Sequence, residues 1–180
     1  MNLKNKMVLP KKILIINRYP LLALILSLIL YNWVLSTTDH SKDYFVWMIL
    51  LASGGKMVTI IWISLSKIKE YLREFSSLQS VFLSFFVLIF VTIASFALDY
   101  HCLQGVQPFS ISGIQIEQSS YLQQLFDFFY FSFITFSTIG YGDIVPISIY
   151  AKLLVMAETF MSFFIVVFAF SNISKMHLKN

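Results

Sequence analysis

The sequence contains little cysteine and little charge. Cys102 is the one cysteine among 180 residues, so neither an internal disulfide nor a metal site of paired cysteines can form. The three histidines are scattered without ligand spacing, and no nucleophile stands near a base, so the sequence predicts no metal centre, no cofactor and no enzyme. Charged residues make up 12% of the chain, against about 25% in soluble domains. These shortages exclude a disulfide-stapled domain and an ordinary soluble enzyme.

Hydrophobic residues, in contrast, make up 58% of the chain and aromatic residues 17%, with a mean hydropathy of +0.77. Four apolar stretches stand out, at residues 20–35, 44–65, 78–98 and 149–170. A helix of about 20 apolar residues crosses the hydrocarbon core, so the stretches predict a membrane protein with four spans. The first is short, and residues 13–16 would extend it. A cleaved signal peptide is the alternative for this region, but no small-residue cleavage site follows the run.

The basic residues gather in segments that four spans would place on one side of the membrane. Ten of the 13 do so: Lys4, Lys6, Lys11, Lys12, Arg18, Lys67, Lys69, Arg73, Lys175 and Lys179. Cytoplasmic loops carry such an excess, so both termini are predicted to be cytoplasmic, in the cell membrane. The net charge of +4 is thereby explained by topology, and no nucleic acid partner is needed.

A further apolar segment, residues 121–137, lies between the third and fourth stretches and is rich in phenylalanine. Ser120 and Gln123 form a capping-box pattern at its start. A full crossing here would move the C-terminal lysines to the outside. A re-entrant half-helix, which enters the membrane and returns, keeps the charge rule intact.

The sequence Thr-Ile-Gly-Tyr-Gly-Asp follows this half-helix at residues 138–143. Irregular backbone at membrane depth is tolerated where it lines a water-filled path. Glycine at alternate positions permits positive φ angles, so that successive carbonyls can turn toward one axis. Rings of such carbonyls replace the water shell of a bare cation, and four copies surround it. A glycine-rich turn before a helix is the plainer alternative.

This hexapeptide resembles the potassium-channel signature sequence, and residues 130–143 resemble the pore region of the prokaryotic ion-channel and two-pore-domain superfamily. The resemblance covers residues 78–171. It implies an all-α membrane protein with four transmembrane helices, a re-entrant pore helix and a selectivity filter between helices three and four. A single filter motif further implies a fourfold symmetric homotetramer, surrounded by membrane lipid.

The resemblance also implies roles for single residues. K⁺, the permeant ion, would bind the backbone carbonyls of the filter, namely those of Thr138, Ile139, Gly140 and Tyr141, with Gly142 allowing the outer turn. Residues implied to support the filter are Asp143, Tyr130, Phe131, Thr135 and Ser137. In many relatives a tryptophan stands in the place of Tyr130 and donates to the aspartate, and a phenol can donate too. A Tyr130–Asp143 hydrogen bond is therefore predicted.

Three further features are open to two interpretations. Phe163, Val166 and Phe170 share a helix face that would line an inner gate, with Ser162 at the place of a hinge glycine; ordinary helix packing is the alternative. Lys56 and Glu158 are mid-membrane charges that could pair; the alternative is a snorkelled lysine and a glutamate near the pore helix. Cys102 is either a free thiol or an inter-subunit bridge.

The predicted division has five parts. These are a cytoplasmic basic N-terminus (1–19), a two-helix peripheral membrane region (20–66), a cytoplasmic linker (67–77), a pore module (78–171) and a short cytoplasmic tail (172–180). The pore module comprises an outer helix (78–98), an extracellular loop (99–120), a pore helix (121–137), the filter (138–143) and an inner helix (149–170). The predicted function is passive, potassium-selective conduction; the alternatives are a nonselective cation channel and a non-conducting membrane partner subunit.

Overall fold

The computed structural model describes residues 18–36, 43–66, 78–114 and 119–177, and these form helices with one small sheet. The helices are α2 (Arg18–Ser36), α3 (Asp43–Ser66), α5 (Leu78–Val106), α6 (Tyr121–Phe136) and α7 (Ile149–His177). Strands β1 (Ile111–Ser112) and β2 (Val145–Pro146) pair antiparallel. The all-helical class is thus confirmed. The predicted linker, and residues 1–17 of the predicted N-terminus, lie outside the described residues.

Three of these helices are long and apolar enough to cross a membrane. Their apolar segments are Tyr44–Trp62, Phe82–Val106 and Ile149–Ser171. The first predicted span, residues 20–35, lies on α2, where the apolar segment Arg18–Val34 is shorter. The chain is therefore a membrane protein.

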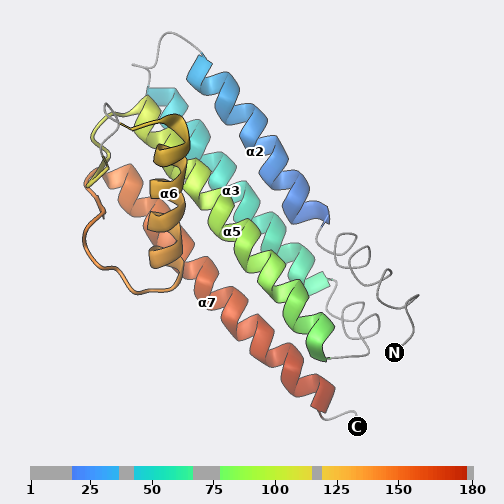
Figure 1. Cartoon of the computed structure of the whole chain (residues 1–180). Coiled ribbons are helices and arrows are strands. Elements are labelled where there is room, and N and C mark those ends of the chain that lie inside the picture. Colours follow the sequence, from blue (N-terminus) through green and yellow to red (C-terminus); the bar gives the residue numbers. More distant parts are fainter. Residues whose placement is uncertain (1–17, 37–42, 67–77, 115–118, 178–180) are drawn as a thin grey trace.

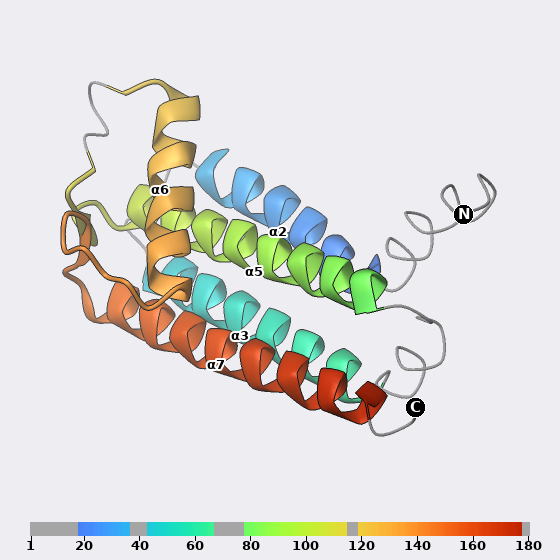
Figure 2. The ribbon, with the colours of Figure 1, turned by 60° about the horizontal axis from the view of Figure 1, so that its bottom comes forward.

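The long helices run side by side in alternating directions, and α5 lies at the centre of the bundle (Figure 1). The start of α2 and the end of α7 lie at the same end of the bundle. Helix α6 crosses the bundle steeply at the opposite end, against α5 and α7 (Figure 2). The chain then returns from the end of α6 to β2 and the start of α7.

Helix α5 continues to Val106, well into the stretch predicted as a loop from residue 99. The sequence suggested a loop because polar residues begin at Asp99. Their side chains have partners inside the bundle: Asp99 bonds to Tyr31, and Gln104 bonds to the backbone of Ile111. A buried polar side chain that is hydrogen-bonded does not interrupt a helix, so α5 extends past its apolar part.

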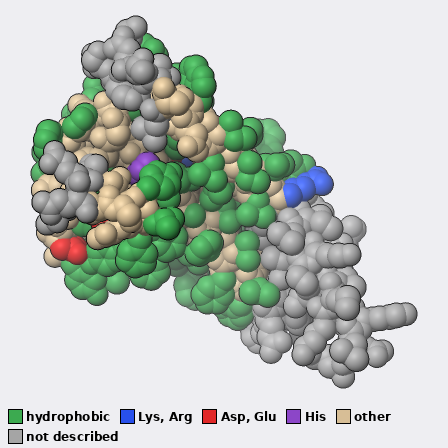
Figure 3. Space-filling model, turned by 45° about the horizontal axis from the view of Figure 1, so that its top comes forward, with side chains coloured by type: hydrophobic (Ala, Val, Ile, Leu, Met, Phe, Trp, Pro, Cys, Tyr) green, Lys and Arg blue, Asp and Glu red, His purple; other side chains and the backbone are tan. Residues whose placement is uncertain are grey.

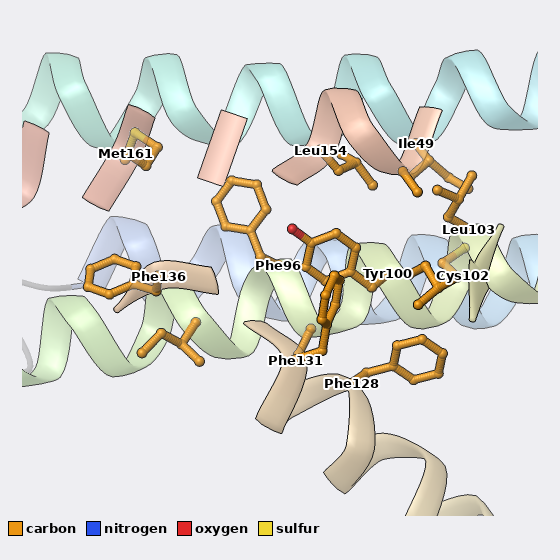
Figure 4. Packing of buried hydrophobic residues seen from close by; sticks show 14 of the residues in the cluster. Ile49, Phe96, Tyr100, Cys102, Leu103, Phe128, Phe131, Phe136, Leu154 and Met161 are labelled. Atoms are coloured by element: carbon orange, nitrogen blue, oxygen red, sulfur yellow. The ribbon is translucent and has the colours of Figure 1, made fainter. Parts of the chain in front are cut away.

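The core forms where α5, α6 and α7 meet (Figure 4). Tyr100 of α5 packs edge-on against Phe131 of α6, with ring centroids 4.8 Å apart. Phe128 of α6 and Leu154 of α7 are also buried there. The phenylalanines of α6 thus anchor its inner face to the bundle.

The outer surface is largely apolar. Hydrophobic side chains cover much of the described part of the face in Figure 3, and the acidic and basic side chains visible there lie far apart. Leu26, Leu51 and Phe86 are each more than 60% exposed on α2, α3 and α5. A soluble monomer rarely exposes so continuous an apolar surface, whereas lipid or another protein surface would cover it.

Candidate functional site

The predicted filter, residues 138–143, begins where α6 ends. Ser137 is the C-cap in right-handed helical conformation. Beyond it, the amide of Thr138 donates to the Thr135 carbonyl at 2.9 Å. The amides of Ile139 and Gly140 both donate to the carbonyl of Ile134, at 3.0 and 3.4 Å. The first half of the segment is therefore tied to the last turn of α6.

The backbone of the segment alternates in handedness. Thr138, Gly140 and Gly142 have φ angles of 57°, 56° and 80°, whereas Ile139 and Tyr141 lie outside the positive-φ region. This conformation is open to glycine and costly for a β-branched residue such as Thr138. A Cβ added at Gly140 or Gly142 would meet no atom within 4 Å, so conformation and not space requires these glycines. Alternation of this kind can turn successive carbonyls toward the same side.

The same segment lies open on the surface of the chain. Tyr141 is 70% exposed and Ile139 50% exposed. Strained, exposed backbone that is held by a rigid helix is typical of a binding site.

Tyr130 and Asp143 connect α6 to the end of the segment. The Tyr130 hydroxyl donates to Asp143 Oδ2 at 2.7 Å, so the predicted hydrogen bond is present. The amide of Ile144 donates to Asp143 Oδ1 at 3.0 Å. Donation by Tyr130 lowers the pKa of Asp143, and the same bond raises the pKa of Tyr130. The carboxyl group is therefore held in its charged form.

The loop after α5 packs and bonds against the residues that follow the filter segment. The sequence did not predict this contact. The β1–β2 pair joins this loop to the residues after Asp143, and Ser110 O accepts from the amide of Ile147 at 2.8 Å. Gln104 bonds to both backbone groups of Ile111, at 2.8 and 3.2 Å. At Gly113, where φ is 97°, a Cβ would lie 2.1 Å from the Asp143 carbonyl oxygen. Gly113, which directly follows β1, was the available signal in the sequence.

Lys56 and Glu158 have separate partners, which corrects the predicted pairing. The Lys56 ammonium forms an ion pair with Asp99, whose carboxylate is fully buried. Tyr31 also donates to Asp99, at 2.5 Å. Lys56, Tyr31 and Asp99 thus connect α3, α2 and α5. The pairing interpretation was wrong because the sequence placed Asp99 in a loop, outside the reach of Lys56. The snorkelled lysine of the alternative is not found either, since Lys56 bonds to Asp99 inside the bundle.

Glu158 lies fully buried between α5, α6 and α7. The Tyr100 hydroxyl lies 2.7 Å from its Oε2, and Ser132 Oγ lies 2.5 Å from its Oε1. The alternative interpretation, a glutamate near the predicted pore helix, therefore matches its position.

The candidate gate residues divide between two faces of α7. Phe163, Val166 and Phe170 are 60%, 44% and 70% exposed and share an outward face. Ser162 is 3% exposed, and its hydroxyl donates to the Thr159 carbonyl. Ser162 is thus not part of that face, because it lies one residue, about 100° of helix rotation, from Phe163.

Cys102 is a free, fully buried thiol within α5. It faces the core and not the outer surface, because α5 is longer than the sequence suggested. Its burial within one chain favours the free thiol over the inter-subunit bridge. Within the described residues, no group of three His, Cys, Asp or Glu side chains could hold a metal ion.

Comparison with known proteins places these features in a family. The model of the family described as "Ion channel" matches residues 81–179. The potassium channels K2 of Plasmodium falciparum and Plasmodium berghei are each 32% identical over 79 residues. This match covers 44% of the chain but 5% of each relative, so the chain spans a small part of their length. No solved structure matches the chain.

Proposed function

The chain belongs to the ion channel family, and from that premise we propose that it conducts K⁺ passively across a membrane through a carbonyl-lined filter at residues 138–143. The observation that carries this proposal is the alternating backbone of this segment, with positive φ at Thr138, Gly140 and Gly142. Carbonyls turned to one side can replace the hydration shell of a cation that has entered without water. Thr138, Ile139, Gly140 and Tyr141 would supply those carbonyls.

A homotetramer is part of the proposal. One chain supplies a single strand of the filter, whereas four strands surround a potassium ion. The exposure of Ile139 and Tyr141 supports this assembly, since both would be covered by neighbouring copies. Four spans per subunit, with α6 as a re-entrant pore helix and both termini in the cytoplasm of a cell, complete the arrangement.

Selectivity for K⁺ over Na⁺ is proposed on two grounds. The name of the Plasmodium relatives describes potassium channels, and the segment here retains the glycines and tyrosine of the potassium-channel signature. The Tyr130–Asp143 bond supports a rigid outer end, which would hold the carbonyls at a fixed spacing.

The test is ion flux through liposomes that contain the purified full-length chain. Potassium-loaded vesicles should take up tracer K⁺ at a rate far above the Na⁺ rate in matched sodium-loaded vesicles. Protein-free vesicles provide the background. Equal K⁺ and Na⁺ flux would leave a nonselective cation channel, and background flux of both ions would leave a non-conducting partner subunit; each result overturns the proposal.

A further inference from the structure

In the part of the chain that the structure describes, the hydrogen-bonding partners of Glu158 are hydroxyl groups, and no cation pairs with it. Tyr100 Oη and Ser132 Oγ are its hydrogen-bonding partners, and the side chain is fully buried. The ammonium group of Lys56 is paired with Asp99 instead. A buried carboxylate with no positive partner is costly, since burial removes its hydration and neutral hydroxyl groups replace only part of it.

The number of hydrogens available around Ser132 also indicates that Glu158 carries a proton. Ser132 Oγ lies 2.8 Å from the Ile93 carbonyl oxygen and 2.5 Å from Glu158 Oε1. Two oxygens approach this closely when a hydrogen lies between them. The serine hydroxyl has one hydrogen, and the Ile93 carbonyl has none. If Ser132 donates to Ile93, the hydrogen of the other contact must come from Glu158.

We propose that Glu158 is an uncharged carboxylic acid that donates its hydrogen bond to Ser132 and thereby positions α6 behind the filter. The inference rests on the proposed function, because it assigns Glu158 a role in that filter. Tyr100 then donates to the other carboxyl oxygen, so each group in the chain Tyr100–Glu158–Ser132–Ile93 has a partner. Glu158 is a positioning residue, since it acts on the filter through α6.

The position of Ser132 explains how this bond reaches the filter. Ser132 lies two residues before Ile134, whose carbonyl holds the amides of Ile139 and Gly140. The Ser132 bonds to Glu158 of α7 and to Ile93 of α5 therefore fix the turn of α6 to which the filter segment is hydrogen-bonded. Ionisation of Glu158 would remove the donor to Ser132 and leave an uncompensated charge against the helix.

Among the described residues, none of the groups that face Glu158 offers it an uncompensated positive charge. Helix α5 presents Tyr100 and Asp99, and the negative charge of Asp99 is balanced by Lys56 of α3 with a hydrogen bond from Tyr31 of α2. Helix α6 presents Ser132 to Glu158. The acidic residue of α6, Asp127, lies five residues before Ser132, which is more than one helical turn.

Infrared spectroscopy of the full-length chain in a detergent without ester groups tests the protonation state directly. A protonated carboxylic acid has a carbonyl stretch that a carboxylate and an amide lack. We expect this band in the unchanged chain, its loss in Glu158→Gln, and its retention in Asp127→Asn, the matched control on α6. Persistence of the band in Glu158→Gln, or its complete absence from the unchanged chain, would overturn the proposal.

Potassium flux through the same variants tests the positioning role. Glutamine keeps a donor for Ser132 and an acceptor for Tyr100, so Glu158→Gln should conduct at a rate close to that of the unchanged chain, with the same pH profile. Glu158→Ala removes the donor and should reduce flux about tenfold, in line with the loss of one buried hydrogen bond. An equal loss in both variants would contradict the role. If the unchanged chain carries no K⁺, the proposed function fails, while the infrared band still decides the state of Glu158.

Discussion

At the scale of single residues, the proposed function depends on backbone conformation more than on side-chain chemistry. Gly140 adopts positive φ in open space, so its lack of a side chain serves conformation alone. Gly55 in α3 also has open space around its Cβ position, but its backbone is helical. The two glycines therefore differ in the one property that matters for the filter.

Gly140→Ala should abolish K⁺ flux, because alanine in the left-handed region costs about 1–2 kcal/mol and the segment will relax away from it. Gly55→Ala is the matched control and should leave flux unchanged while stabilising α3 by up to about 1 kcal/mol. Liposome flux and thermal unfolding in detergent measure the two effects. Normal flux in Gly140→Ala would show that the alternating backbone is not required.

Tyr130→Phe should make the channel more sensitive to external acid. The Tyr130 hydroxyl lowers the pKa of Asp143, so the support that the carboxylate gives is present above its ordinary pKa and is lost as pH falls through the lowered value. Without the hydroxyl the pKa rises toward its ordinary value, and the loss of flux should begin at higher pH. Tyr121→Phe, the same change on an exposed tyrosine of α6, is the control. Identical acid profiles for Tyr130→Phe and the unchanged chain would contradict this role.

Contacts between residues close together in the sequence could be predicted, whereas contacts between distant parts of the chain could not. The Tyr130–Asp143 bond was predicted because both residues belong to one local motif. The partners of Lys56 and the contact at Gly113 were not, because they depend on how far α5 extends and where its loop returns. The assignment of Asp99 to a loop caused the main errors, since apolar periodicity ends before the helix does.

At the scale of helices, the buried Lys56–Asp99 ion pair and its hydrogen bond from Tyr31 link the first two described helices to α5. Lys56 of α3 and Tyr31 of α2 both bond to Asp99 of α5. Removing one partner of such a pair leaves the other charge buried and uncompensated.

Asp99→Asn should therefore destabilise the bundle by about 3–5 kcal/mol, while the double variant Asp99→Asn with Lys56→Met should recover much of this loss. Thermal unfolding in detergent measures the coupling. Reversing the pair, Lys56→Glu with Asp99→Lys, should likewise recover stability, whereas Lys56→Glu with Glu158→Lys should not. Additive losses in the Lys56/Asp99 double variants would rule the coupling out.

At the scale of the whole molecule, the exposed apolar surface and the exposed filter segment must both be shielded from water by lipid or by another protein surface. Lipid can cover the outward faces of α2 and α3, but it does not hydrogen-bond the exposed backbone of residues 138–142. The proposed assembly of four copies meets both needs, since it encloses the filter and leaves the apolar faces toward lipid.

The mass of the purified particle tests this assembly. In mild detergent, native mass spectrometry should show four copies of the 20.8 kDa chain, with no cross-linking reagent required. Reducing agent should leave that mass unchanged, because the Cys102 thiol is buried within one chain. A monomer or dimer that still conducts K⁺ in liposomes would overturn the assembly.

The neighbours Asp99 and Tyr100 bear on whether the conducting part of this chain could exist alone. Asp99 and Tyr100 are adjacent in α5. The Asp99 side chain bonds to α2 and α3, and the Tyr100 side chain bonds to Glu158 of α7. If α2 and α3 were removed, Asp99 would face lipid without a partner, one residue away from the contact that braces α6. The two-helix hairpin is therefore not a detachable accessory. Any minimal version of this chain must retain the hairpin or first replace Asp99 with an apolar residue.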